Sequence, residues 1–385
     1  MEGKAMPDKA PAVDRSKIRR GLLLAVSISA FALVVISLLT MQRETLSALS
    51  RISPLYVAAA VFLSLGRWLW SALRMRILVS STGKRVPFFN LVKTVYGGYF
   101  TGIVTPWRAG GVAGETVFLY HYGLGAGEAT AVVSFGACIS TVLLILFFPL
   151  AIWLAEKYVR VTVTVKGFLF SALGIGVIFL ALVLLALLRP QATVGKPLAR
   201  RSPAFLKGRK GYRRFLERLS EETNRFALAL RALVNLGWKK ILLATLLTLL
   251  YWVTGFLAVP VAMLGLGYGS YFWNAIVAQL IVQLLLPFIP TPGSSGIGEV
   301  GFLFVYGSIL PDMGAAALLT LVWRFIDFYV GLVVGGGAFL IIMRDLDRTP
   351  RRAPAGGPSD REGSDEPADA LPGAGSAAVV NGSGE

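Results

Sequence analysis

Charged side chains interrupt several long apolar stretches of this sequence, and these are the residues that could do chemistry. Arg108 and Glu115 accompany a glycine-rich segment in the first half, and Glu299 closes a similar segment in the second half. A charged side chain at the centre of a bilayer costs at least about 2.5 kcal/mol unless it is paired or hydrated. Charges at such positions therefore indicate a binding site or an internal ion pair.

Three further charges lie inside apolar stretches. Arg67 falls near the middle of 55–79, and Arg324 and Asp327 lie three residues apart within 315–343. Residues at this spacing share one face of a helix, so Arg324 and Asp327 can pair with each other. Such a pair serves either the function of the protein or the cohesion of its helices.

Arg108 has the chemistry of a phosphate ligand. Its guanidinium is a planar fork of donors that suits phosphate oxygens. The free N–H groups of a helix that begins near Gly110 and Gly111 would add positive potential. Glycine at these positions also allows close backbone approach, either to a ligand or to a neighbouring helix. We therefore predict that this segment binds a lipid phosphate.

The second glycine-rich segment contains matching candidates in Gly293 and Gly296, which precede Glu299. The two glutamates, Glu115 and Glu299, have three possible roles. They can contact a cationic headgroup, take part in proton coupling or neutralise nearby arginines. The sequence does not choose between these roles.

The composition places these charges in a membrane protein. The chain has 385 residues, of which 55% are hydrophobic and 15% are charged, and its mean hydropathy is +0.67. We predict an all-α polytopic membrane protein. The net charge of +17 by itself would suit nucleic acid, but in a membrane protein it favours the anionic cytoplasmic leaflet as the partner. Nucleic acid is not expected, because the sequence contains no basic, aromatic-bearing soluble module.

Cysteine and histidine are nearly absent, which restricts the possible enzymes. Cys138 is the single cysteine and His121 the single histidine, so an intrachain disulfide is excluded and a histidine-based zinc centre is disfavoured. We expect no catalytic residue, no metal and no cofactor. These absences favour a transporter over an enzyme, and the sequence leaves an enzyme open.

Six apolar segments are long enough to cross a hydrocarbon core of about 30 Å as helices. They are 21–40, 55–79, 128–154, 167–188, 241–264 and 315–343. The basic residues that flank them, such as Arg74 and Arg76 at the end of 55–79, place both termini in the cytoplasm, as expected for a multi-pass protein of the cell membrane. Segment 189–240 is strongly basic and is predicted to be a cytoplasmic linker with an interfacial helix on anionic lipid.

Two remaining segments, 90–125 and 271–310, each begin and end on one side of the membrane by this count of spans. Each is broken in the middle by proline and glycine, and most of their arms are too short to cross comfortably. We predict two re-entrant helical hairpins in an inverted repeat, an architecture that many secondary transporters use. Two short, tilted spans are the alternative for 90–125.

The domain organisation follows from these segments. A basic cytoplasmic N-terminus (1–20) precedes a transmembrane domain (21–343), and the tail (344–385) is rich in proline, glycine, serine and alanine. A tail of this composition is predicted to be disordered.

Two motifs resemble those of the lysylphosphatidylglycerol synthase transmembrane region, also called the flippase-like domain family. The first consists of Pro106, Arg108, Gly114 and Glu115, followed by an apolar stretch and Gly123, and the second is the run 290–299 that ends in Glu299. Gly298 stands where the family often has arginine before the second glutamate. The resemblance covers about 21–343 and implies a membrane domain that moves lipids between leaflets. No soluble aminoacyl-transferase domain accompanies it, so lipid aminoacylation is not implied.

We therefore predict a flippase or translocase for a phosphate-bearing lipid or lipid-linked molecule. One alternative is a membrane-embedded transferase that acts on a polyprenyl- or lipid-linked substrate. Another is a non-transporting scaffold subunit of an envelope complex, and the sequence leaves a homo-oligomer open. The predicted substrate-binding residues are Arg67, Arg108, Gly110, Gly111, Glu115, Gly293, Gly296, Glu299, Arg324 and Asp327.

Overall fold

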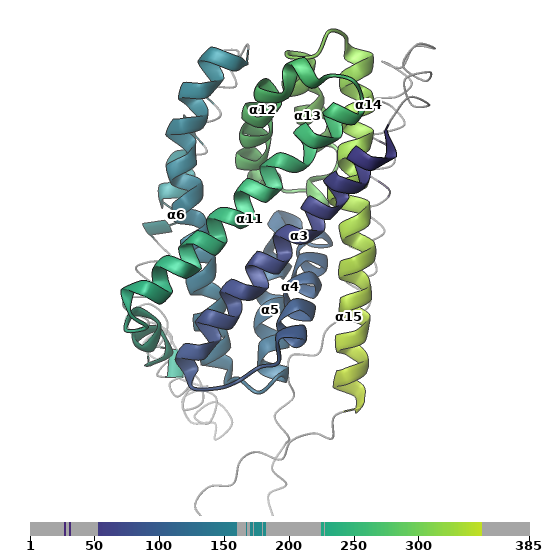
Figure 1. Cartoon of the computed structure of the whole chain (residues 1–385). Coiled ribbons are helices and arrows are strands. Elements are labelled where there is room, and N and C mark those ends of the chain that lie inside the picture. Colours follow the sequence, from purple (N-terminus) through teal and green to yellow (C-terminus); the bar gives the residue numbers. More distant parts are fainter. Residues whose placement is uncertain are drawn as a thin grey trace, which may run out of the picture. The chain divides into compact units, whose positions relative to one another are not determined.

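The computed structural model describes residues 53–159 and 228–348, together with scattered positions at 27 and 31, between 167 and 181, and at 225 and 226. Within these parts every regular element is a helix (Figure 1). Most of the predicted helix at 21–40, about half of the predicted helix at 167–188, most of the basic segment 189–240 and the tail beyond Arg348 lie outside the described residues. The predictions made for them are therefore not tested.

The first half of the described chain contains one long helix, a broken hairpin and a second long helix. Its elements are α3 (Pro54–Val79), the 3-10 turn η1 (Ser80–Thr82), α4 (Phe88–Ile103), the 3-10 turn η2 (Pro106–Arg108), α5 (Ala109–His121) and α6 (Ala126–Tyr158). Proline opens α3 and η2, where its missing N–H leaves no helical hydrogen bond unmade.

The second half repeats this plan with more interruptions. Its elements are α11 (Trp238–Gly265), η4 (Gly269–Tyr271), α12 (Phe272–Leu285), η5 (Leu286–Phe288), η6 (Pro292–Ser294), α13 (Ile297–Gly307), α14 (Met313–Trp323), the π-helical turn η7 (Arg324–Tyr329) and α15 (Val330–Arg348). Asp312 caps α14, because its side chain accepts a 2.7 Å hydrogen bond from the N–H of Ala315.

Five helical stretches of the described chain are long and apolar enough to cross a membrane. They are Pro54–Thr82, Ala126–Tyr158, Trp238–Gly265, Gly269–Phe288 and Met313–Leu346. Four of them match predicted spans. The remaining stretch, Gly269–Phe288, belongs to a segment that we predicted to be a hairpin, and it is long because η4 and η5 extend α12 at both ends. The count of six spans and the re-entrant form of the hairpins stay predictions.

The helices pack across the two halves of the chain. Helix α3 lies along α11, and the two run side by side in Figure 1. The first arm of each hairpin packs on the last helix of the other half: α4 contacts α15, and α12 contacts α6. The second arms stay within their own halves, with α5 against α6 and α13 against α14.

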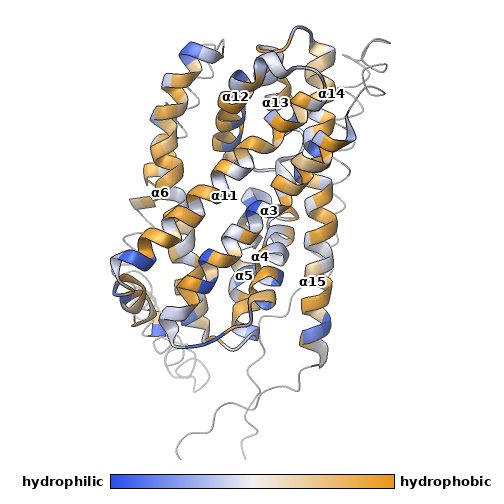
Figure 2. Ribbon diagram, viewed as in Figure 1, coloured by the Kyte–Doolittle hydropathy of each residue, from blue (hydrophilic) through white to orange (hydrophobic). Residues whose placement is uncertain are grey.

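The largest buried cluster lies around the second hairpin. At its centre the ring of Phe302 is stacked between Tyr306 and Trp323, with ring centroids 4.2 and 4.3 Å apart. Apolar side chains also cover the outside of the helices, where Phe62 and Phe304 are each 75% exposed. Figure 2 shows this hydrophobic character along the long helices, with hydrophilic residues gathered near their ends. Such a surface suits contact with lipid.

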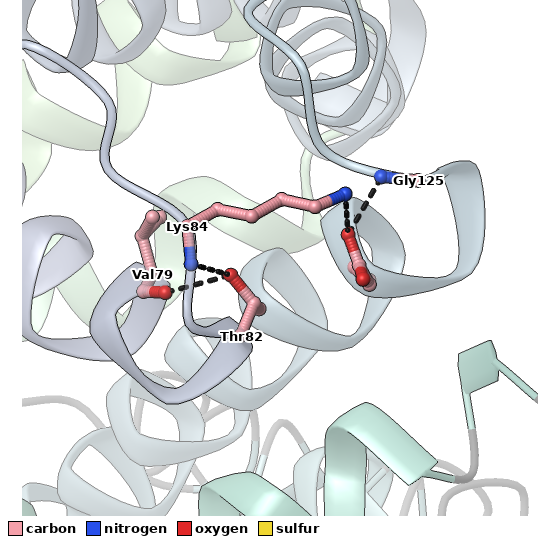
Figure 3. A network of polar contacts seen from close by, with 5 residues as sticks. Val79, Thr82, Lys84 and Gly125 are labelled. Atoms are coloured by element: carbon pink, nitrogen blue, oxygen red, sulfur yellow. Dashed lines mark hydrogen bonds and ion pairs between the residues drawn. The ribbon is translucent and has the colours of Figure 1, made fainter. Parts of the chain in front are cut away.

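A polar network joins the loop after α3 to the start of α6 (Figure 3). Lys84 donates a 2.6 Å hydrogen bond to Glu128, which also accepts a 2.7 Å bond from the N–H of Gly125. The Thr82 hydroxyl accepts from the N–H of Lys84 and donates to the carbonyl of Val79. This network fixes the connection between α3 and the hairpin that follows it.

Candidate functional site

The two helix breaks are strained and lie against each other. Trp107, Arg108 and Ser294 have φ values of 50°, 55° and 55°, and within the described parts of the chain no other residue besides glycine has a positive φ. Backbone of this kind is sparsely populated and gathers at functional sites. The turns that hold these residues, η2 and η6, are in direct contact. The two tips therefore meet.

Threonines shape the first tip. The Thr105 hydroxyl accepts a 2.8 Å hydrogen bond from the N–H of Gly110, and the Thr101 hydroxyl donates a 2.8 Å bond to the carbonyl of Gly110. A side chain at Gly110 would collide with the backbone carbonyl of Thr101, and one at Gly111 would lie 3.3 Å from the carbonyl of Gly98. These glycines allow α5 to close on α4, and their predicted contact with a ligand is not tested.

An arginine from the last span holds the second tip. Arg324 donates 3.0 Å hydrogen bonds to the carbonyls of Gly293 and Ser294, and it forms a 2.6 Å ion pair with Glu299. Glu299 is fully buried and Arg324 is 2% exposed. A buried carboxylate needs a paired cation of this kind. Among the predicted roles for Glu299, the geometry supports neutralisation of an arginine.

Arg324 and Asp327 do not pair with each other, so that prediction was wrong. Asp327 instead forms a 2.6 Å ion pair with Arg67 of α3. Arg324 and Asp327 both belong to the π-helical turn η7, whose wider turn changes which side chains share a face. Arg324 consequently points to the second hairpin, and Asp327 points to α3.

Arg108 differs from both of these arginines. Its guanidinium carbon lies 5.6 Å from the centre of the Tyr99 ring, a cation–π distance. Within the described residues its side chain forms no hydrogen bond or ion pair, and its Nε is buried without a partner. Glu115, seven residues further along, packs against Gly98. Glu115 has an electrostatic interaction with Arg74 but forms no direct ion pair with it.

Sequence reasoning missed an aromatic cluster and one arginine near the tips. The Trp68 ring centre lies 4.5 Å from that of Tyr99 and 5.4 Å from that of Tyr251. Arg67 sits 4.8 Å from the Trp68 ring. Arg74, which we assigned only to the flank of a span, lies on the same face of α3 as Arg67. The signal was present, because Arg67 and Arg74 are seven residues apart and so share one helix face.

Long apolar helices that surround paired buried charges define a multi-pass membrane protein. The chain belongs to the family described as the lysylphosphatidylglycerol synthase TM region, whose model matches residues 22–335. It is also similar to a UPF0104 membrane protein of Archaeoglobus fulgidus, with 28% identity over 323 residues that cover 82% of this chain and 94% of the relative. The predicted family resemblance is confirmed.

Gly298 is the position where this chain departs from the family pattern, and the structure gives a physical account of it. A side chain at Gly298 would begin 2.9 Å from Nη2 of Arg324. The guanidinium that accompanies the second glutamate therefore comes from η7, and glycine leaves the room for it.

Proposed function

We propose that this protein moves a phosphate-bearing lipid or lipid-linked molecule between membrane leaflets. One observation carries the proposal: Arg108 stands at the contact of the two hairpin tips, and no carboxylate of the described residues forms an ion pair with it. Arg67 and Arg324, by contrast, are each paired with an acid. Arg108 is thus the arginine best able to take an external anion.

The packing of the helices supports the architecture that such movement needs. The reciprocal contacts of α4 with α15 and of α12 with α6, together with the α3–α11 pair, are the pattern expected of an inverted repeat. In transporters with such repeats the substrate site lies near the membrane midplane, where broken helices meet. The positive-inside rule further supports a cell-membrane protein with both termini in the cytoplasm.

The chemistry of the first tip suits a phosphate in particular. A guanidinium matches two phosphate oxygens at once. Arg108 also directly precedes α5, and the N-terminus of a helix carries partial positive charge. Trp107 is 64% exposed beside it and offers an apolar surface to an acyl chain. The first hairpin tip can therefore contact the phosphate and an acyl chain of one lipid at the same time.

The proposal is tested with leaflet-specific quenching of fluorescent phospholipids in liposomes. We expect the wild-type protein to move lipid faster than protein-free liposomes do. Arg108→Gln should slow this movement by about tenfold or more, the effect of losing a charged hydrogen bond. Arg108→Lys, which keeps the charge but not the planar fork, should retain part of it.

The matched control is Arg76→Gln, since Arg76 is an exposed arginine at the end of α3 and lies away from the tips. It should move lipid at the wild-type rate. Equal rates for wild type and Arg108→Gln would contradict the role of Arg108. Absence of movement by the wild-type protein for phosphatidylglycerol, phosphatidic acid and a polyprenyl phosphate would overturn the proposed function itself.

A further inference from the structure

A polar stripe runs along the inward face of α3. Ser64, Arg67 and Ser71 are 3%, 5% and 5% exposed, and their spacing of three and four residues continues to Arg74. Residues at this spacing line one face of a helix. Serines on such a face are common where membrane helices pack closely, but arginines are costly inside a membrane and packing does not require them. The arginines of the stripe therefore call for a separate explanation.

Arg74 is bonded differently from Arg67, the other arginine of the stripe. It donates a 3.2 Å hydrogen bond to the Ser71 hydroxyl and a 3.4 Å bond to the Thr248 hydroxyl of α11. Its Nε is buried and has no partner. Neutral oxygens thus hold this guanidinium, whereas Asp327 directly neutralises Arg67. Arg74 retains both charge and donor capacity for an anion.

A glycine and a carboxylate lie near the guanidinium of Arg74. On the side of α6 Gly136 packs closely against it, because an added side chain would begin 3.4 Å from Nη2. On the side of α5 it interacts electrostatically with Glu115, yet no ion pair joins the two. A cation and a carboxylate therefore lie near enough to attract each other, and within the described residues neither forms a direct ion pair.

The position of Arg74 places it between the tips and one end of the helices. It lies seven residues beyond Arg67, which corresponds to about 10 Å along α3. Arg67 belongs to the aromatic cluster at the first tip, and the basic residues Arg76, Lys84 and Arg85 follow Arg74. An anion that moves between that end of α3 and the tips would pass Arg74.

We propose that Arg74 forms a second site for the lipid phosphate and that Glu115 limits the affinity of this site. The inference rests on the proposed function, because its ligand is the same phosphate-bearing lipid. A site on a transport path must bind strongly enough to take up its ligand and weakly enough to release it. The negative charge of Glu115 opposes the phosphate and prevents a dead-end complex.

Removing the charge of Arg74 and removing the charge of Glu115 should change binding in opposite directions. Such opposite effects are not expected if both residues are merely structural. The measurement is isothermal titration calorimetry of the full-length Arg108→Gln protein, in which the first site is removed, with dihexanoyl phosphatidic acid. Adding Arg74→Gln should weaken binding by about tenfold or more. Adding Glu115→Gln should tighten binding several-fold. Adding Arg76→Gln should leave binding unchanged. The Arg74→Lys variant is also tested by thermal unfolding, and an unchanged midpoint shows that a loss of binding at this position is not a loss of fold.

Three outcomes would overturn the inference: unchanged binding with Arg74→Gln, weaker binding with Glu115→Gln, or binding of inorganic phosphate alone. The last result would assign the site to free phosphate and not to a lipid. Binding is measured without lipid movement, so the two proposals can fail separately. A protein that binds at Arg74 but moves no lipid contradicts the proposed function alone, and one that moves lipid without this binding contradicts the inference alone.

Discussion

The two hairpins of this protein share a plan but hold their charges in different ways. In the second hairpin, Glu299 is fully buried and paired with Arg324, which also fixes the backbone of the tip. In the first hairpin, Arg108 rests only on the ring of Tyr99, and Glu115 has no direct ion pair. The comparison separates a hairpin whose charges are paired with each other from a hairpin whose charges form no direct ion pair within the described residues.

One turn of the last span connects both hairpins. Arg324 of η7 reaches the second tip, and the backbone carbonyl of Asp327 in the same turn accepts a hydrogen bond from the Tyr99 hydroxyl of the first hairpin. The Asp327 side chain meanwhile pairs with Arg67 of α3. The π-helical turn thus joins three elements that an α-helical turn would present differently.

The largest expected effect comes from removing the cation of the second hairpin. Arg324→Gln would leave the buried carboxylate of Glu299 without its ion pair, which costs about 3–5 kcal/mol. We expect a marked fall in the midpoint of thermal unfolding, followed by circular dichroism in detergent. The double variant Arg324→Met with Glu299→Met should recover much of the loss, since no buried charge is then left unpaired. A single variant as stable as wild type would remove the distinction between the hairpins.

A smaller loss is expected at the ion pair between α3 and the π-helical turn. Asp327→Asn removes the negative charge that neutralises Arg67 but keeps an oxygen that can accept its hydrogen bond. We therefore expect a loss of about 1.5–3 kcal/mol, the worth of a hydrogen bond to a charged group. The measurement is a double-mutant cycle with Arg67→Gln, in which we expect the two effects to be strongly non-additive. Additive effects would show that the pair does not join these elements.

Much of this arrangement could be predicted from the sequence. Proline and glycine within apolar stretches located both helix breaks, and the rarity of charge in such stretches identified Arg67, Arg108 and Arg324 as residues of interest. These are local signals, because a helix break and an unfavourable charge are visible without knowledge of neighbours. Four of the predicted spans were recovered for the same reason.

The partners of the charges could not be predicted. Arg324 and Glu299 are 25 residues apart on different elements, and their pairing depends on how α13 packs against α14 and η7. Helical spacing suggested Asp327 as the partner, but the π-helical turn altered that spacing. Arg74 was assigned to a basic flank because its hydroxyl partner, Thr248, lies on a helix 174 residues away. Tertiary packing decides such contacts.

The first hairpin should depend on backbone packing where the second depends on charge. In Gly110→Ala the added methyl group would collide with the carbonyl of Thr101, which belongs to a helix and cannot move aside. Overpacking of this kind costs about 1–3 kcal/mol. The matched control is Gly66→Ala, because nothing lies within 4 Å of its added side chain. Equal unfolding midpoints for the two variants would contradict the close approach of α5 to α4.

The smallest effect on stability is expected for Arg108, although its effect on function is the largest. Arg108→Gln removes a cation–π contact with Tyr99, worth about 0.5–1 kcal/mol, and breaks no ion pair. The unfolding midpoint should therefore stay close to that of wild type while lipid movement is lost. The opposite is expected at Arg324, where stability falls first. If Arg108→Gln instead unfolds as readily as Arg324→Gln, both arginines are structural, and the charges of the first hairpin are no more available to a ligand than those of the second.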